Sequence, residues 1–197
     1  MITFGWAIGV FVGVFAATKI GGSAHLNPAI TIAFAAAGKF EWASVPGFIG
    51  AQIVGSIFGS LLVWLSYHDH YKATDDANTK LATFATIPAI RNPLYNFITE
   101  TIGTFVLVFA VFFLAAPSSS LGALDALPVA LLVLGLGLSL GGPTGYAINP
   151  SRDLGPRILH AILPIRNKGG SDWSYAWVPI AGPIAGGLLA ALLFMNL

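Results

Sequence analysis

The chain has 197 residues, of which 56% are hydrophobic and only 9% are charged. Soluble domains carry roughly 25% charged residues, so the composition excludes an ordinary soluble protein and predicts an integral membrane protein. The net charge of +1 offers no basic surface, and no nucleic-acid partner is expected. The absence of cysteine excludes disulfides, thiol catalysis and thiolate metal sites, and no cofactor is expected.

Five apolar stretches approach the length of about 20 residues that crosses the hydrocarbon core of a bilayer. These predicted spans are residues 2–18, 43–67, 94–116, 127–141 and 175–196. Two further helix-like segments, 27–38 and 149–163, reach only about 18–22 Å at 1.5 Å per residue and are too short to span. Short apolar helices at corresponding places in two halves indicate discontinuous helices and an inverted repeat.

The two halves share one order of elements. An apolar helix is followed by a Gly-rich turn, an Asn-Pro-Ala/Ser box, a short helix and a Val-Pro pair that opens a Gly-rich span, over residues 4–60 and again over 129–190. The second half also has a preceding helix that contains Glu100. Its counterpart in the first half would fall before Met1, so we expect the first repeat to lack its opening helix.

Each box begins a short helix by ordinary local rules, because Asn is a preferred N-cap and Pro is favoured at the first helical position. Inverted symmetry would bring both helix N-termini together near the bilayer midplane. Each terminus carries roughly +0.5 elementary charge and free N–H groups, which repels cations and protons. The asparagine amides can donate to a passing hydroxyl. The boxes comprise Asn27, Pro28, Ala29, Asn149, Pro150 and Ser151.

The segments before the boxes, GGSAHL (21–26) and GGPTGYAI (141–148), are rich in turn residues and are predicted to be non-helical. Irregular backbone at membrane depth is tolerated against a water-filled cavity, where its carbonyls would form a ladder of acceptors. Donors at the centre and acceptors along one side suit a small polyol. The imidazole of His25 either lines the pore or holds its loop by a hydrogen bond. The candidate pore-lining residues are Ser23, Ala24, His25, Thr144, Gly145 and Ala147.

The paired boxes, SAHLNPAITIA and GYAINPSRDLGPR, resemble those of the major intrinsic proteins, the aquaporin and glycerol-facilitator channels, and the resemblance runs from Ile2 to about Leu193. It implies an all-α membrane bundle with two re-entrant half-helices and one pore per subunit, assembled as a homotetramer in the cell membrane. We expect one transmembrane channel domain over 1–197. It would comprise a first repeat (1–67), a solvated extracellular loop (68–93) and a second repeat (94–197).

The resemblance also implies a selectivity filter on the extracellular side of the asparagines. Its members would be Arg152, the aromatic Tyr146, Gly137 and Trp6. Gly137 stands where water-selective members have a histidine and leaves room for a larger solute. Trp6 lies one residue farther from Asn27 than the family pattern has it. It keeps its role if the Gly-rich turn between them absorbs the extra residue.

Other residues fit the glycerol branch of the family. Asp153, Arg157 and Pro179 stand where that branch is distinguished from water channels. For Asp153 we expect a structural role, holding the loop or neighbouring N–H groups so that the filter widens. Glu100 lies within a span, and its family counterpart accepts hydrogen bonds from the loop that leads into the nearby box.

The physical character of these residues agrees with a polyol pore. Two aromatic faces would pack against the CH groups of the solute, while a guanidinium donates to adjacent hydroxyls. We expect a passive channel for glycerol and other small neutral solutes, including water and possibly urea or dihydroxyacetone, that excludes ions and protons. A mainly water-conducting channel, a secondary transporter and an inactive membrane protein remain alternatives. No nucleophile–base pair is evident, so no enzyme is expected.

Overall fold

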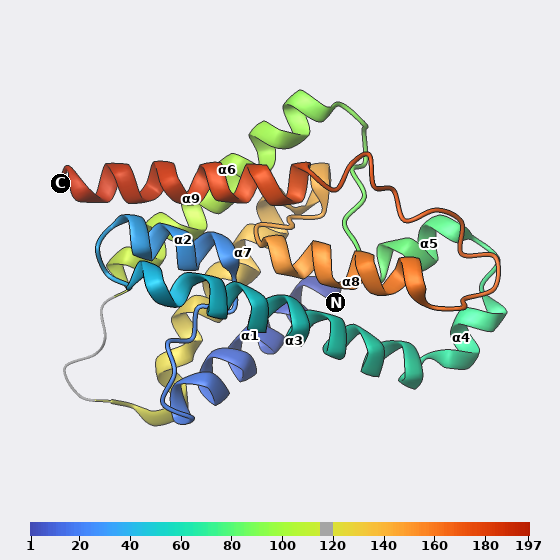
Figure 1. Ribbon diagram of the computed structural model, residues 1–197, viewed down its shortest axis with the longest axis horizontal. Coiled ribbons are helices and arrows are strands. Elements are labelled where there is room, and N and C mark those ends of the chain that lie inside the picture. Colours follow the sequence, from blue (N-terminus) through green and yellow to red (C-terminus); the bar gives the residue numbers. More distant parts are fainter. Residues whose placement is uncertain (115–119) are drawn as a thin grey trace.

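The computed structural model describes residues 1–114 and 120–197, and within them every regular element is a helix (Figure 1). Residues 115 and 116, the end of the predicted span 94–116, lie outside the described residues. The long helices are α1 (Ile2–Lys19), α3 (Val45–Ser66), α6 (Pro93–Phe113), α7 (Leu127–Thr144) and α9 (Val178–Met195). The shorter ones are α2 (Pro28–Ala36), α4 (His68–Ala73), α5 (Ala77–Ala82) and α8 (Pro150–Ile162), with 3₁₀ turns η1 (Trp42–Ser44) and η2 (Gly122–Ala126).

The five long helices are apolar and long enough to cross a membrane, and α1, α7 and α9 have the minimum length of 18 residues. They coincide with the five predicted spans, and α2 and α8 coincide with the two predicted half-helices. The all-α fold class predicted from the sequence is therefore confirmed. Large apolar side chains remain exposed along these helices, as lipid-facing or subunit-facing surfaces require.

One predicted boundary was wrong. Residues 141–148 were expected to be non-helical throughout, but α7 continues through Pro143 to Thr144. The helix ends where Gly145 adopts a left-handed conformation (φ 75°) and its N–H bonds the carbonyl of Gly141 at 2.9 Å. A glycine in this conformation is a common helix terminator, and it sets the end of α7 more strongly than the turn residues before it.

The segment 68–93 is less solvated than expected. It contains α4 and α5, and its Tyr71 and Phe84 are buried against residues at the end of α8 and just beyond it, including Leu159 and Ile165. This aromatic cluster fixes the segment over one end of the bundle. In Figure 1 this end, on the right, carries α4, α5 and the end of α8.

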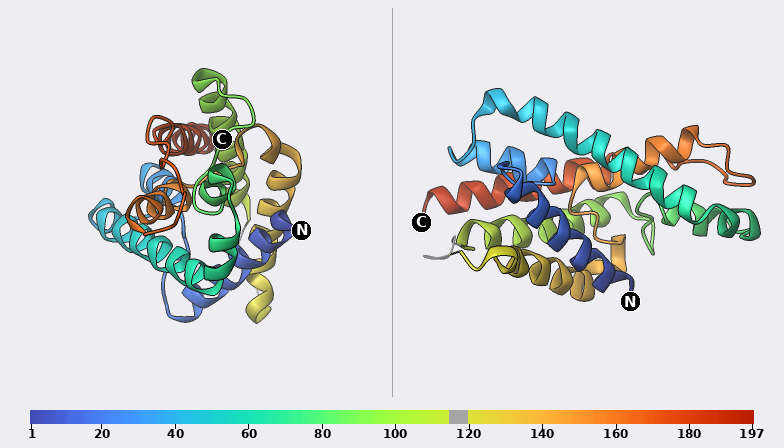
Figure 2. Two further views of the ribbon diagram at one scale, coloured as in Figure 1. Left: turned by 90° about the vertical axis from the view of Figure 1, so that its right-hand side faces the viewer. Right: turned by 90° about the horizontal axis from the view of Figure 1, so that it is seen from below.

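The packing of the helices follows the internal repeat. The half-helix of each repeat packs on the last helix of the other, α2 on α9 and α8 on α3, while α1 packs on α7. The two repeats are thus interlocked. Helix α6 packs closely along α9, where Gly182 and Gly186 leave no space for a side chain against the backbone of α6. Figure 2 shows α3 and α7 on opposite sides of the bundle.

Helix α3 lacks an equivalent neighbour. A Cβ added at Gly47, Gly50, Gly55 or Gly59 would meet nothing within 4 Å. A hollow of about 1140 Å³ lies between α1 and α3, and no helix of the described ranges covers α3 as α6 covers α9. This agrees with the expectation that the first repeat has no counterpart of α6 within this sequence.

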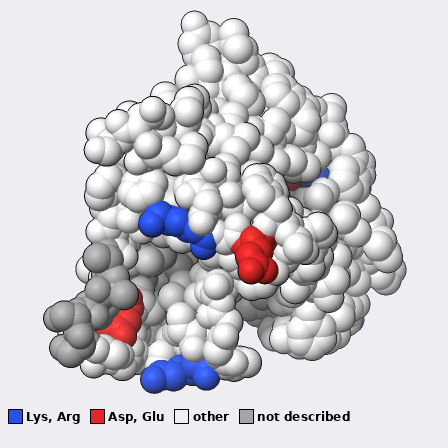
Figure 3. All heavy atoms as spheres, turned by 60° about the vertical axis from the view of Figure 1, so that its left-hand side comes forward, with Lys and Arg blue, Asp and Glu red and all other residues white. Residues whose placement is uncertain are grey.

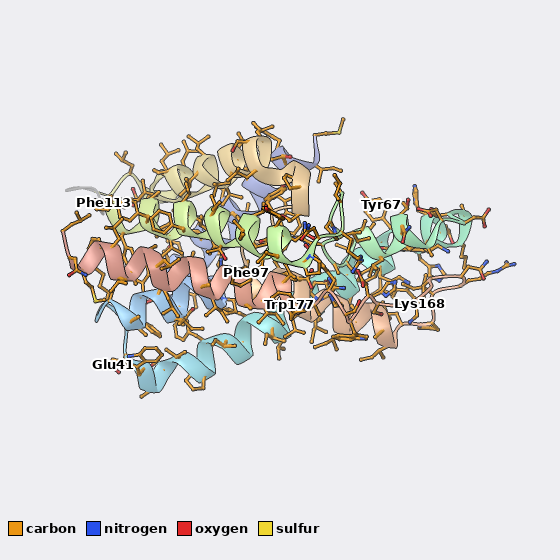
Figure 4. All side chains as sticks on the ribbon, turned by 90° about the horizontal axis from the view of Figure 1, so that it is seen from above. Glu41, Tyr67, Phe97, Phe113, Lys168 and Trp177 are labelled. Atoms are coloured by element: carbon orange, nitrogen blue, oxygen red, sulfur yellow. The ribbon has the colours of Figure 1, made fainter. Side chains whose placement is uncertain are left out.

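Charged side chains are sparse on the outer surface. Figure 3 shows a face on which a few Lys, Arg, Asp and Glu side chains are surrounded by uncharged atoms. Along the bundle, Figure 4 places Glu41 and Phe113 towards one end and Lys168 at the other, with Phe97 of α6 beside Trp177 in the middle. The rings of Phe97 and Trp177 stack with centroids 5.9 Å apart.

Candidate functional site

The two Asn-Pro boxes meet at the centre of the molecule. The amide nitrogen of Asn27 donates to the carbonyl of Ile148 at 2.7 Å, and that of Asn149 donates to the carbonyl of Leu26 at 2.9 Å. Each asparagine therefore bonds to the residue that precedes the other. An amide NH₂ group has two hydrogens, so each side chain retains one donor for a solute.

The asparagine oxygens cap the two half-helices, as the sequence predicted. The Asn27 oxygen accepts from the N–H of Ala29 at 2.9 Å, and the Asn149 oxygen accepts from the N–H of Ser151 at 3.0 Å. Because oxygen and nitrogen are both engaged, the orientation of each amide is fixed. The positive ends of α2 and α8 therefore face each other across the point where the boxes meet.

The loop that leads into the second box is conformationally strained. Gly145, Tyr146 and Ile148 all have positive φ angles, of 75°, 38° and 41°. Non-glycine residues in this region cost about 1–3 kcal/mol each and persist only where the surroundings hold them. One such support is the buried carboxylate of Glu100, which accepts from the N–H groups of Ala147 at 2.9 Å and Ile148 at 2.7 Å.

Three of the four predicted filter residues come together. The guanidinium carbon of Arg152 lies 4.5 Å from the centre of the Trp6 ring, and Tyr146 lines the same cavity. The extra residue between Trp6 and Asn27 therefore does not move Trp6 away. Among the described residues the guanidinium has no hydrogen-bond acceptor. Its donors are left for water or a solute.

Gly137 does not line the cavity. A Cβ at this position would lie 2.9 Å from Cζ of Tyr146 and would also run into the methyl group of Thr3. The space that Gly137 leaves is thus filled by the Tyr146 ring, which packs against Gly137 and Gly141 of α7. The glycine thereby lets the Tyr146 ring and the Thr3 methyl group pack against α7.

The cavity has a volume of about 560 Å³ and runs past the asparagines, the filter and α1. Most of its wall is apolar, and its charged lining residues within the described ranges are Arg152 and Lys39. Of the predicted loop residues, Ser23, Ala24, His25 and Ala147 line it. Thr144 and Gly145 do not, because α7 continues through Thr144 and the chain turns at Gly145.

His25 satisfies both alternatives that the sequence left open. Its ring lines the cavity, and its Nδ1 lies 3.2 Å from the hydroxyl of Thr31, which also accepts from the Gln52 amide. The imidazole packs among the rings of Phe34, Phe40 and Phe48, with centroids 4.8–5.6 Å away. It therefore holds its loop while presenting one face to the cavity.

Asp153 and Arg157 form a fully buried ion pair behind the filter. Arg157 Nε donates to one carboxylate oxygen at 2.7 Å and Nη2 donates to the other at 2.9 Å. The second oxygen also accepts from the N–H and the hydroxyl of Thr86. The sequence pointed to Asp153 and Arg157 but missed Thr86. Thr86 belongs to no motif, and its partner lies 67 residues away in the chain, so no local pattern indicates the contact. Pro179, the third branch residue, is buried in the first turn of α9.

Charged groups outside the spans surround the end of α8. Burial, and to a smaller extent the neighbouring Lys168 and Arg157, lower the pKa of His160 to about 4. Its Nδ1 lies 2.8 Å from the hydroxyl of Ser171. Burial also lowers the pKa of Lys168, whose ammonium donates to three carbonyls at and beyond the end of α8.

The cavity also adjoins the hollow between α1 and α3. Within the described residues, six line both spaces and form the boundary between the pore and this side hollow: Trp6, Val10, Ser23, Leu26, Asn149 and Arg152.

Comparisons with known proteins agree with this geometry. The chain is 55% identical to glycerol uptake facilitator protein 3 of Lactiplantibacillus plantarum over 193 residues, which are 98% of this chain and 80% of the relative. It is 53% identical to a probable glycerol uptake facilitator protein of Thermotoga maritima over 98% of this chain and 82% of the relative. The solved aquaglyceroporin of Plasmodium falciparum matches with a TM-score of 0.81 at 28% identity, covering 99% of this chain and 81% of that one.

A family model agrees with these relatives. The model described as major intrinsic protein matches residues 1–194, which is nearly the whole chain. This match shows that the chain belongs to the major intrinsic protein family.

Proposed function

We propose that the protein is a passive channel for glycerol and other small neutral solutes, with water as a further permeant. The observation that carries the proposal is the cluster of Trp6, Tyr146 and Arg152 at one cavity. Two aromatic side chains suit the CH groups of a polyol, and a guanidinium with no acceptor among the described residues has donors for its hydroxyls. The curated relatives named as glycerol uptake facilitators support the same solute class.

The asparagine pair would act as the second contact point for the solute. Asn27 and Asn149 each keep one amide hydrogen after their crosswise bonds, and the carbonyls of the loops offer acceptors nearby. A hydroxyl both donates and accepts, so a polyol can exchange one set of bonds for the next. The loop residues Ser23, Ala24, His25 and Ala147 are proposed to line this path.

A mainly water-conducting pore is the first alternative. The packing of the Tyr146 ring against Gly137 argues for the larger solute, because a side chain at residue 137 would push this ring away from α7. A secondary transporter would need an intramembrane acid or ion site. The two candidate acids, Glu100 and Asp153, are both engaged in structural bonds, to backbone N–H groups and to Arg157.

We further propose that the repeats act as one channel domain of a multi-pass cell-membrane protein and that the protein works by transport without catalysis. The interlock of α2 with α9 and of α8 with α3 supports a single domain. Exposed apolar faces on the long helices fit lipid on one side and neighbouring subunits of a homotetramer on the other. Solutes proposed beside glycerol are urea and dihydroxyacetone.

Stopped-flow light scattering on proteoliposomes tests the channel. The wild-type protein is expected to pass glycerol, and the Arg152→Ala variant is expected to lower the ratio of glycerol to water permeability by about tenfold, since hydrogen bonds from a charged donor are lost. Urea serves as a second neutral solute. Wild-type vesicles that take up glycerol no faster than empty liposomes would contradict the proposal.

A further inference from the structure

A single residue outside the pore touches both segments that carry the filter. Thr86, in the segment Phe84–Ile90 between α5 and α6, is 3% exposed. Its N–H and its hydroxyl donate to the same oxygen of Asp153, at 2.7 and 2.6 Å. Asp153 directly follows Arg152 in the chain. The threonine therefore fixes the carboxylate beside the filter arginine.

The same threonine also faces the other filter segment. A Cβ placed on Gly145 would lie 3.5 Å from the methyl carbon of Thr86. Gly145 directly precedes Tyr146, in the strained loop with three positive φ angles. Glu100 holds the later part of this loop, at Ala147 and Ile148, from the side of the bundle. Thr86 lies beside the start of the same loop, at Gly145.

The segment is anchored firmly enough to act as a support. The carbonyl of Thr86 accepts from Nη2 of Arg157 at 3.2 Å, and the N–H of Ala89 donates to the carbonyl of Pro143 at 3.0 Å. At the far end of the segment, the amide of Asn96 donates to the carbonyl of Ile90 at 3.1 Å. Arg157 in turn donates to the backbone of Ser171 at 2.7 Å, so the segment is bound to α6, α7, α8 and the loop beyond α8.

We propose that Thr86 is a positioning residue that sets solute selectivity, holding Arg152 through Asp153 and Tyr146 through Gly145. It lines neither the pore cavity nor the side hollow, so it acts only through these two residues. The proposal rests on the glycerol channel proposed above. Glycerol must meet the ring and the guanidinium together, whereas a water molecule needs only one donor. Loosening the support therefore penalises glycerol more than water.

The test measures glycerol and water permeability of the same proteoliposomes for Thr86→Val, Thr86→Ala and Thr86→Ser. Val and Ala remove the hydroxyl that binds Asp153, and the ratio of glycerol to water permeability is expected to fall by about three- to tenfold, the effect of one hydrogen bond to a charged group. Ser retains the hydroxyl and is expected to restore the ratio to within about twofold of the wild type. If the Thr86→Val variant fails to assemble, the Thr86→Ala variant makes the same comparison with a smaller side chain.

Thr79 supplies the matched control. It makes the same pair of bonds, from its N–H and its hydroxyl to one oxygen of Asp76, at the exposed start of α5. Thr79→Val is expected to leave the permeability ratio unchanged. An unchanged ratio in Thr86→Val or Thr86→Ala, or an equal fall in Thr79→Val, would overturn the role of Thr86. Absence of glycerol flux in the wild type would instead overturn the channel proposal itself.

Discussion

At the scale of single residues, the filter is shaped by what stands behind it. Trp6 and Arg152 meet face to face, with the guanidinium carbon 4.5 Å from the ring centre. The ring of Tyr146 packs against Gly137, where a side chain would collide with it. The position of this ring beside the cavity therefore depends on an absent side chain on α7.

Adding one methyl group to Gly137 tests this relationship. In Gly137→Ala the new Cβ would collide with the methyl group of Thr3 and would lie 2.9 Å from Tyr146 Cζ, so α1 and the ring are both expected to be pushed away from α7 and to narrow the filter. Glycerol permeability is expected to fall about tenfold and water permeability less, an overpacking effect of the size seen in tight cores. Stopped-flow scattering measures both. Gly135→Ala is the control on the same helix, because its Cβ meets nothing within 4 Å; a similar loss there would contradict the explanation.

At the scale of helices, glycines of α9 allow its close approach to α6, whereas those of α3 face no neighbouring helix. A Cβ at Gly186 of α9 would lie 2.8 Å from the backbone nitrogen of Phe105 and would collide with the carbonyl oxygen of Thr101. The backbone of α6 cannot yield without separating from α9. Gly59 of α3, by contrast, faces open space. The second repeat is therefore packed more tightly than the first.

Gly186→Ala is expected to destabilise the bundle by about 1–3 kcal/mol, since the contact is with backbone and not with a flexible side chain. The thermal unfolding midpoint of the purified protein in detergent, followed by helical circular dichroism, measures the effect. Gly59→Ala should leave the midpoint unchanged or raise it slightly, because alanine favours a helix over glycine. Equal shifts in the two variants would show that the α6–α9 interface is not the cause.

The end of α8 makes stability depend on pH. His160 is buried against Phe84 and bonded to Ser171, and its pKa is lowered from 6.5 to about 4 by burial, with Lys168 and Arg157 adding to the effect. In the unfolded chain the imidazole binds a proton below its ordinary pKa, while the folded protein does not. Stability is therefore expected to be complete above pH 6.5 and to decline as the pH falls towards 4.

A shift of one pKa unit corresponds to about 1.36 kcal/mol, so protonation of this residue is expected to lower the free energy of unfolding by up to roughly 3 kcal/mol in total. Unfolding midpoints measured across this pH range for wild type and His160→Asn check it, because asparagine keeps a hydrogen-bonding side chain but does not titrate. The variant should be less stable at neutral pH and should lose much of the wild type's decline. An identical pH profile in both would assign the decline to other groups.

At the scale of the whole molecule, the sequence predicted what local rules and periodicity encode. The half-helices follow from Asn and Pro at their first positions, and the spans follow from apolar length. It did not predict that α4 and α5 pack on the end of α8, or that Tyr146 fills the space at Gly137. These features depend on contacts between residues far apart in the chain, such as Thr86 with Asp153, which no local pattern specifies.

The electrostatics of the whole pore lead to the last prediction. The helix N-termini at Asn27 and Asn149, the guanidinium of Arg152 and the ammonium of Lys39 all place positive charge at the cavity. Among the residues described as lining it there is no carboxylate to offset them. A cation would therefore meet a barrier along the whole path, and a proton would meet the same field, whereas a neutral solute crosses without electrostatic work.

Glycerol flux is accordingly expected to be independent of membrane potential and of an imposed proton gradient, with proton leak equal to that of empty vesicles. A pH-sensitive dye inside proteoliposomes, read during a potassium-driven potential, measures the leak. Arg152→Gln is expected to raise the cation leak several-fold, because each charge removed near a low-dielectric passage lowers the barrier by more than 1 kcal/mol. Lys72→Gln removes the same charge from an exposed site on α4 and should have no effect. Glycerol uptake that follows the proton gradient would instead identify a coupled transporter, in which a titrating group takes part in every transport cycle.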